Sequence, residues 1–216
     1  LHEQAAALGR PAPRIALAAP TGKAAARLAE AVHAEAANLE VTEAVREALV
    51  ATEAVTLHRL LGIWPGRRNP AGHDAANPLP HEVVIVDESS MVGLTLMARL
   101  LAAVRPSARL VLVGDPRQLV SVEAGAVLGD LVASALPGTT VLRRVHRYGG
   151  GIARVAAAIE RGDADAVIDA LRASPEDVTW IEVDAATDPT RAPELASVRR
   201  AVVEAARTVV ASARGG

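Results

Sequence analysis

Two continuous apolar runs, residues 83–86 and 110–113, constrain the fold of this chain most strongly. Both are rich in β-branched residues and lack the polar alternation of a half-solvated strand, so they predict strands covered on both faces of a parallel sheet. Residues 94–104 predict a crossover helix between them, and the apolar run at residues 14–19 predicts a third strand. This order predicts an α/β domain, in which functional loops lie at the carboxyl ends of the strands.

The remainder of the chain predicts helices around these strands. A stretch rich in Pro, Gly, Asn and Arg predicts a loop or small insertion at residues 64–80. Pro137 marks a break, so we expect a first domain over residues 1–136 and a second α/β segment over residues 137–216, with a strand at 178–183. Apolar spacing and capping signals predict helices over residues 21–38, 42–51, 56–61, 124–135, 151–161, 164–171 and 193–213.

Composition excludes several kinds of site. The chain of 216 residues has no cysteine, which rules out disulfides, thiolate zinc sites and cysteine nucleophiles. Its six histidines show no metal-ligand spacing, and a formal net charge of −2 leaves nucleic-acid binding undecided. No apolar run is as long as a membrane span and the first residues form no signal peptide, so we expect a cytoplasmic protein. The start without methionine and the Ala-Arg-Gly-Gly end predict an internal fragment.

Asp87 and Glu88 directly follow the strand predicted at residues 83–86. A carboxylate at a strand tip can hold Mg²⁺ through its water shell, and a neighbouring carboxylate can orient the water that attacks a γ-phosphate. The same two residues could instead cap the following helix, because acidic side chains stabilise helix N-termini. Their position after a buried strand favours the Mg²⁺ and phosphate chemistry.

Two further polar segments could complete such a phosphate site. Gln118 follows the strand at residues 110–113 and can donate to a γ-phosphate, although the Gly-Asp-Pro before it is also typical of an ordinary turn. Arg147 lies in a basic segment beyond the break at Pro137, where an arginine can reach across a cleft and stabilise transition-state charge. The alternative for the basic segment is a solvated turn.

Pro20, Thr21 and Lys23 lie where the first strand leads into a helix. The sequence fails the P-loop pattern at its first glycine and at its final Ser or Thr. A Thr hydroxyl, N–H groups at a helix start and the only lysine of the chain can still hold a phosphate, and a nucleic-acid backbone phosphate is the natural candidate. An N-cap threonine beside a surface lysine is the alternative. His58 and Arg59 are a weaker signal, which a solvated helix face explains equally well.

Taken in order, these segments resemble the RecD family of superfamily 1B DNA helicases, which includes the alpha subunit of exodeoxyribonuclease V. The resemblance covers about residues 16–163, and the ordered set is more specific than any one segment. Residues 19–28 are similar to motif Ia and residues 56–62 to the segment that follows it, while residues 86–91, 114–119 and 145–152 are similar to motifs II, III and IV.

The resemblance implies a RecA-like sheet domain of the P-loop NTPase type, followed by the start of a second RecA-like domain. It implies that Asp87 holds Mg²⁺, that Glu88 positions water, and that Gln118 and Arg147 sense the γ-phosphate of ATP. By the same resemblance, a track for single-stranded DNA would be lined by Pro20, Thr21, Lys23 and His58.

The family couples ATP hydrolysis to 5′ to 3′ movement on single-stranded DNA. Its exodeoxyribonuclease V member works with RecB-like and RecC-like subunits in DNA double-strand break repair and recombination. This sequence departs from the family, because neither the glycine-rich P-loop before motif Ia nor motifs V and VI are found. We therefore expect the function to belong to a parent protein and the fragment alone to be inactive. A noncatalytic scaffold module and the helicase domain of a conjugative relaxase remain as alternatives.

Overall fold

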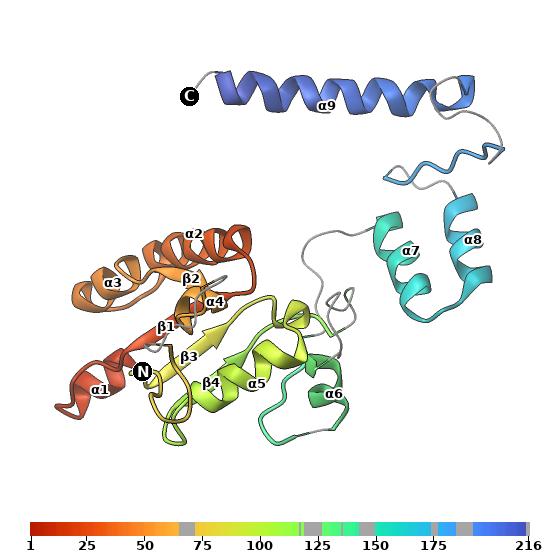
Figure 1. Cartoon of the computed structure of the whole chain (residues 1–216). Helices are drawn as coiled ribbons and strands as arrows, with labels where there is room; N and C mark the ends of the chain where they lie inside the picture. Colours follow the sequence, from red (N-terminus) through yellow and green to blue (C-terminus); the bar gives the residue numbers. More distant parts are fainter. Residues whose placement is uncertain are drawn as a thin grey trace. The chain divides into compact units, whose positions relative to one another are not determined.

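The computed structural model describes residues 1–64, 72–116, 118, 127–134, 136–142, 150–173, 177–184 and 192–214. The chain divides into two compact units, Leu1–Thr140 and Val141–Gly216 (Figure 1). The assignment of residues 1–136 and 137–216 to two RecA-like domains stays a prediction. None of the helices in the described part of the chain is long and apolar enough to span a membrane.

The first unit is built on a four-stranded sheet with the order β2-β1-β3-β4. The strands are β1 Ile15–Ala19, β2 Ala54–Thr56, β3 Val83–Val86 and β4 Arg109–Leu112, and every neighbouring pair is parallel. The predicted α/β class is therefore confirmed. The sheet also contains β2, which the sequence did not predict because three half-buried residues carry no usable periodicity.

Helices lie on both faces of this sheet (Figure 1). The chain moves from β1 to β2 in one direction and from β3 to β4 in the other, so right-handed crossovers place α2 and α5 on opposite faces. The helical segments of the unit are α1 His2–Ala7, α2 Gly22–Asn38, α3 Glu43–Val50, α4 Leu57–Leu60, the short 3₁₀ helix η1 Ser89–Met91, α5 Leu94–Ala103 and α6 Val127–Ala133.

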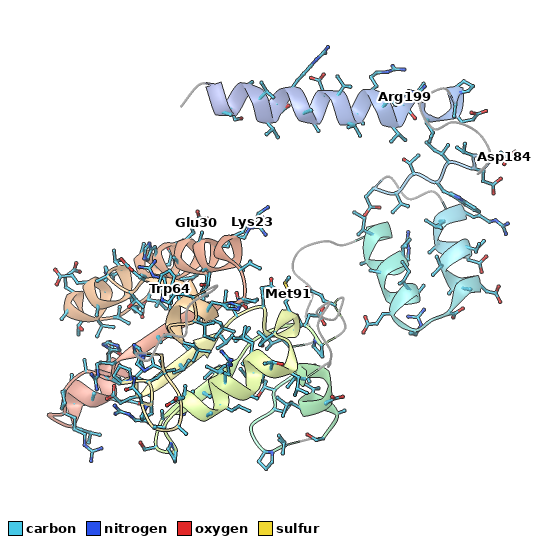
Figure 2. The ribbon with its side chains drawn as sticks, viewed as in Figure 1. Lys23, Glu30, Trp64, Met91, Asp184 and Arg199 are labelled. Carbon is cyan, nitrogen blue, oxygen red and sulfur yellow. The ribbon has the colours of Figure 1, made fainter. Side chains whose placement is uncertain are left out.

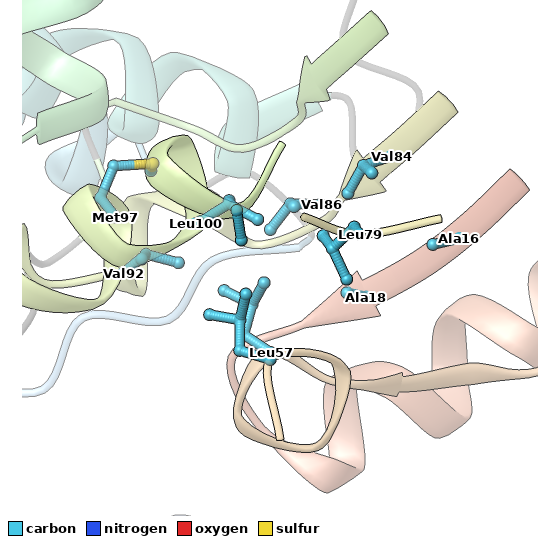
Figure 3. Close-up of a cluster of buried hydrophobic side chains, with 11 residues drawn as sticks. Ala16, Ala18, Leu57, Leu79, Val84, Val86, Val92, Met97 and Leu100 are labelled. Atoms are coloured by element: carbon cyan, nitrogen blue, oxygen red, sulfur yellow. The ribbon is translucent and has the colours of Figure 1, made fainter. Parts of the chain in front are cut away.

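The hydrophobic core lies between α5 and one face of the sheet (Figure 3). Alternate residues of β1 and β3, such as Ala18 and Val86, contribute to it, as a strand period of two requires. Leu100 and Met97 come from α5, and Leu57 comes from the start of α4. The predicted two-sided burial holds for β3, whereas β4 is only half-buried because it is an outer strand of the sheet.

The second unit contains α7 Gly150–Glu160, α8 Ala164–Arg172, the short η2 Pro193–Leu195 and α9 Ala196–Arg214. The Asp177 carboxylate accepts hydrogen bonds from the Ile152 and Gly151 amides at 3.2 and 3.0 Å, which holds the pKa of Asp177 below its ordinary value. The prediction of a strand at residues 178–183 is wrong, because these residues form no strand in the structure. Strand structure needs a paired neighbour, and the described residues of this unit offer none.

Candidate functional site

Three of the predicted site segments share one edge of the sheet. The four strands are parallel, so their carboxyl ends lie together, and the chain leaves β1 at Pro20, β3 at Asp87 and β4 at Val113. Backbone pairing continues past the strand ends, because the Asp87 amide donates to the Ala18 carbonyl at 2.9 Å and the Val113 amide donates to the Val86 carbonyl at 2.8 Å. This ladder brings the Asp87–Glu88 pair between the loops of two other strands.

The backbone turns sharply at Glu88, immediately after β3. Glu88 has φ 50° and ψ 36°, and it is the one non-glycine residue with positive φ in the described part of the chain. A left-handed conformation costs a residue with a β-carbon about 1–2 kcal/mol, so surrounding contacts must hold it. One contact is local, because the Glu88 amide donates to Asp87 Oδ1 at 2.9 Å. Both acidic residues are half-buried at this turn.

Ser89 ties the turn to the end of β4. Its backbone N–H and its hydroxyl both donate to the Val113 carbonyl, at 2.9 and 2.6 Å, and its side chain has no exposed surface. Gly114 follows Val113 and runs so close to η1 that a β-carbon there would lie 3.1 Å from the Ser89 nitrogen. Ser89 and Gly114 lie in the segments similar to motifs II and III, but no role was predicted for either residue from the sequence. A serine directly after Asp-Glu and a glycine directly after a strand were the available signals.

Gln118 lies in the turn that continues from Gly114. Its amide donates to the Asp115 carbonyl at 3.2 Å, and its side chain is exposed. The fold therefore places Gln118 in the loop that leaves the anchored Val113 at the same edge as Glu88. The other predicted γ-phosphate sensor, Arg147, lies outside the described residues.

The residues predicted to contact DNA lie at the starts of α2 and α4. Thr21 caps α2, since its Oγ1 accepts a hydrogen bond from the Ala24 amide at 3.2 Å. Lys23 is exposed in the first turn, and its side chain extends away from the sheet (Figure 2). Exposed His58 is in the first turn of α4, whose cap is the Thr56 hydroxyl.

The two helix starts belong to neighbouring strands. Ala19 of β1 and Thr56 of β2 are register partners, and Thr21 and His58 each follow two residues later. Pro20, Thr21, Lys23 and His58 are therefore gathered at one corner of the sheet. Helix starts present backbone N–H groups, and together with an exposed lysine and histidine they are suited to bind phosphate oxygens.

The carboxylate oxygens at this edge are suited to Mg²⁺, which is held partly by water and phosphate. They are less suited to a metal whose ligands all come from the protein. The described residues contain no cluster of three or more His, Asp and Glu side chains that could enclose a metal. Mg²⁺ is commonly held by one or two carboxylates together with substrate phosphates and water. The Asp87 carboxylate at the tip of β3 meets that requirement.

Comparison with known proteins agrees with the fold. Residues 1–182 match the AAA domain family. The RecBCD enzyme subunit RecD of Mycolicibacterium smegmatis is 56% identical over 85% of this chain and 33% of that protein. The ATP-dependent RecD2 DNA helicase of Deinococcus radiodurans is 44% identical over 62% of this chain and 15% of that protein. The RecBCD enzyme subunit RecD of Haemophilus influenzae is 44% identical over 54% of this chain and 19% of that protein.

This chain spans about a third of the length of its mycobacterial RecD relatives. The predicted resemblance to RecD is confirmed, since it extends over most of this chain at more than half identity. With a parallel sheet in the first unit and a family match that covers residues 1–182, the chain belongs to the AAA domain family.

Proposed function

We propose that this chain forms part of the motor of an ATP-dependent DNA helicase of the RecD type. The observation that carries the proposal is the shared edge at which the Asp87–Glu88 turn is bonded, through Ser89, to the loop that carries Gln118. A nucleoside triphosphate needs groups that act together on its terminal phosphate, and groups joined by a rigid backbone contact can do so.

Each side chain at this edge has a separate role in the proposal. Asp87 and the phosphate oxygens of ATP would hold Mg²⁺, and that ion would neutralise charge on the β- and γ-phosphates. Glu88 would orient the attacking water. Gln118 would donate to the γ-phosphate, and Arg147 would sense it.

The corner formed by the starts of α2 and α4 would bind single-stranded DNA. Thr21 and Lys23 offer N–H groups and a positive charge to a backbone phosphate, and His58 lies beside them on α4. Polarity of 5′ to 3′, partnership with RecB-like and RecC-like subunits, and a role in double-strand break repair are part of the same proposal. They rest on similarity to RecD proteins.

DNA-stimulated ATPase activity of the complete protein in which this chain occurs tests the motor. We expect single-stranded DNA to stimulate hydrolysis, and Glu88→Gln or Arg147→Ala to abolish the stimulated activity. Glu30→Gln is the matched control, because Glu30 is exposed on α2 and its side chain extends away from the sheet (Figure 2). An inactive unmutated protein would favour the noncatalytic scaffold instead.

Binding of labelled single-stranded DNA tests the corner independently of hydrolysis. We expect Lys23→Ala to weaken DNA binding at low salt. It should also reduce the slope of the logarithm of the binding constant against the logarithm of the salt concentration by the amount expected for roughly one phosphate contact. Arg10→Ala, in the segment before β1, removes another exposed positive charge that lies outside the starts of α2 and α4. An equal effect of the two variants would mean that Lys23 acts only through net charge.

A further inference from the structure

The Val113 carbonyl is the point at which the ends of β3 and β4 meet. It accepts the Ser89 amide at 2.9 Å and the Ser89 hydroxyl at 2.6 Å, while the Val113 amide donates to Val86. Val113 is thus held on one side by the last residue of β3 and on the other by the turn that follows β3. Any movement of Val113 relative to that turn must break these hydrogen bonds.

Glu88 lies between two backbone anchors. The residue before it, Asp87, is bonded to Ala18 of β1, and the residue after it, Ser89, is bonded to Val113. Glu88 itself has the left-handed conformation that a residue with a β-carbon adopts only under constraint. The two backbone anchors supply that constraint.

We propose that Ser89 is a positioning residue that fixes the Gln118 loop relative to Glu88, and that its hydroxyl is needed for hydrolysis although it touches no substrate. This inference rests on the proposed function of Glu88 and Gln118. From Val113 the chain passes through Gly114 to the turn in which the Gln118 amide donates to Asp115. Ser89 acts on Gln118 by holding Val113, the anchored start of the loop that carries Gln118.

Ser90 is a control supplied by the chain itself. Like Ser89 it is buried in η1, with 8% of its surface exposed, but its hydroxyl has no hydrogen-bond partner among the described residues. Ser89→Ala and Ser90→Ala therefore delete the same atom at adjacent buried positions. Only the first deletion removes a bond to the β4 loop.

Steady-state ATPase kinetics of the complete protein, with single-stranded DNA present, test the proposal. We expect Ser89→Ala to lower kcat about tenfold while the KM for ATP changes less than about twofold, because positioning is lost and ground-state binding is kept. Ser90→Ala should retain the kcat of the unmutated protein. Assays run well below the unfolding midpoints of both variants, so that loss of folded protein does not contribute.

A double-mutant cycle with Gln118→Ala separates positioning from general stability. If Ser89 acts through the Gln118 loop, Ser89→Ala should change kcat by less than about twofold once Gln118 is already alanine. The inference is overturned if the separate effects of Ser89→Ala and Gln118→Ala on kcat multiply in the double mutant. It is also overturned if Ser89→Ala and Ser90→Ala have equal kinetics. Should Ser89→Ala not fold, Gly114→Ala disturbs the packing of the β4 loop against the Ser89 and Ser90 nitrogens and must show the same dependence on Gln118. An unmutated protein without ATPase activity would instead refute the proposed function.

Discussion

The backbone of Gly114 lies directly against the amide of Ser90. A β-carbon added at Gly114 would lie 3.0 Å from the Ser90 nitrogen, 3.1 Å from the Ser89 nitrogen and 2.9 Å from Leu128 Cδ2. The leucine methyl can move by rotation, whereas the two nitrogens belong to a buried turn. This close approach explains why glycine follows β4 even though the position does not require a positive φ.

We expect Gly114→Ala to lower the free energy of unfolding by roughly 1–3 kcal/mol, the usual cost of an added methyl in a packed site. Denaturant or thermal unfolding measures the change. Gly22→Ala is the matched control, because a β-carbon at Gly22 would meet no atom within 4 Å. Equal destabilisation by the two substitutions would contradict the steric explanation.

Two adjacent leucines of α5 test the position of the core. Leu100 has no exposed surface and lies in the core cluster, whereas Leu101 is 54% exposed. We expect Leu100→Ala to reduce the free energy of unfolding by about 2–5 kcal/mol, because it removes buried methyl groups and leaves a cavity. Leu101→Ala should change it by less than about 1 kcal/mol. A larger loss at Leu101 would mean that α5 packs through the other side.

Two threonines that precede helices differ in one respect: one caps its helix through a side-chain hydrogen bond and the other does not. The Thr21 hydroxyl accepts the Ala24 amide at 3.2 Å, whereas Thr42 precedes α3 without a side-chain capping bond. We expect Thr21→Ala to cost about 1 kcal/mol of unfolding free energy and Thr42→Ala distinctly less. Urea unfolding compares them, and Thr21→Ser should retain most of the stability. Indistinguishable alanine variants would argue against the cap at Thr21.

His81 makes the stability of the first unit depend on pH. Burial lowers the pKa of His81, and electrostatic interactions with Arg14, His73 and Arg105 lower it further, while Glu82 raises it. Its Nδ1 is buried without a hydrogen-bond partner among the described residues. The unfolded histidine takes up its proton near pH 6.5, but the folded one does so only at lower pH. Stability should therefore be complete above about pH 6.5 and fall as the pH drops toward the folded pKa.

Thermal unfolding between about pH 7.5 and 5 measures this loss, which should be smaller in His81→Gln because glutamine does not titrate. NMR titration of the His81 ring gives the folded pKa directly. A ring that titrates at or above the unfolded value would contradict the prediction, since the folded protein would then gain stability from the proton.

How much of the fold the sequence predicts depends on the length of each pattern. The apolar run at residues 83–86 and the helix beginning after Thr21 formed as predicted, because local burial and capping signals are enough to define them. Short β2 was missed, and the predicted strand at residues 178–183 did not form. A strand is stable only when its backbone pairs with a neighbour, and that neighbour is not a local property of the sequence.

The sequence by itself determined the α/β class and the positions of Asp87, Glu88 and Gln118 after strands, because apolar runs and polar breaks are local features. Only the tertiary structure decided the order β2-β1-β3-β4, the left-handed turn at Glu88 and the bonds from Ser89 to Val113. Those bonds join residues 24 positions apart. They form only when parallel pairing brings the ends of β3 and β4 to the same edge, which no local pattern specifies.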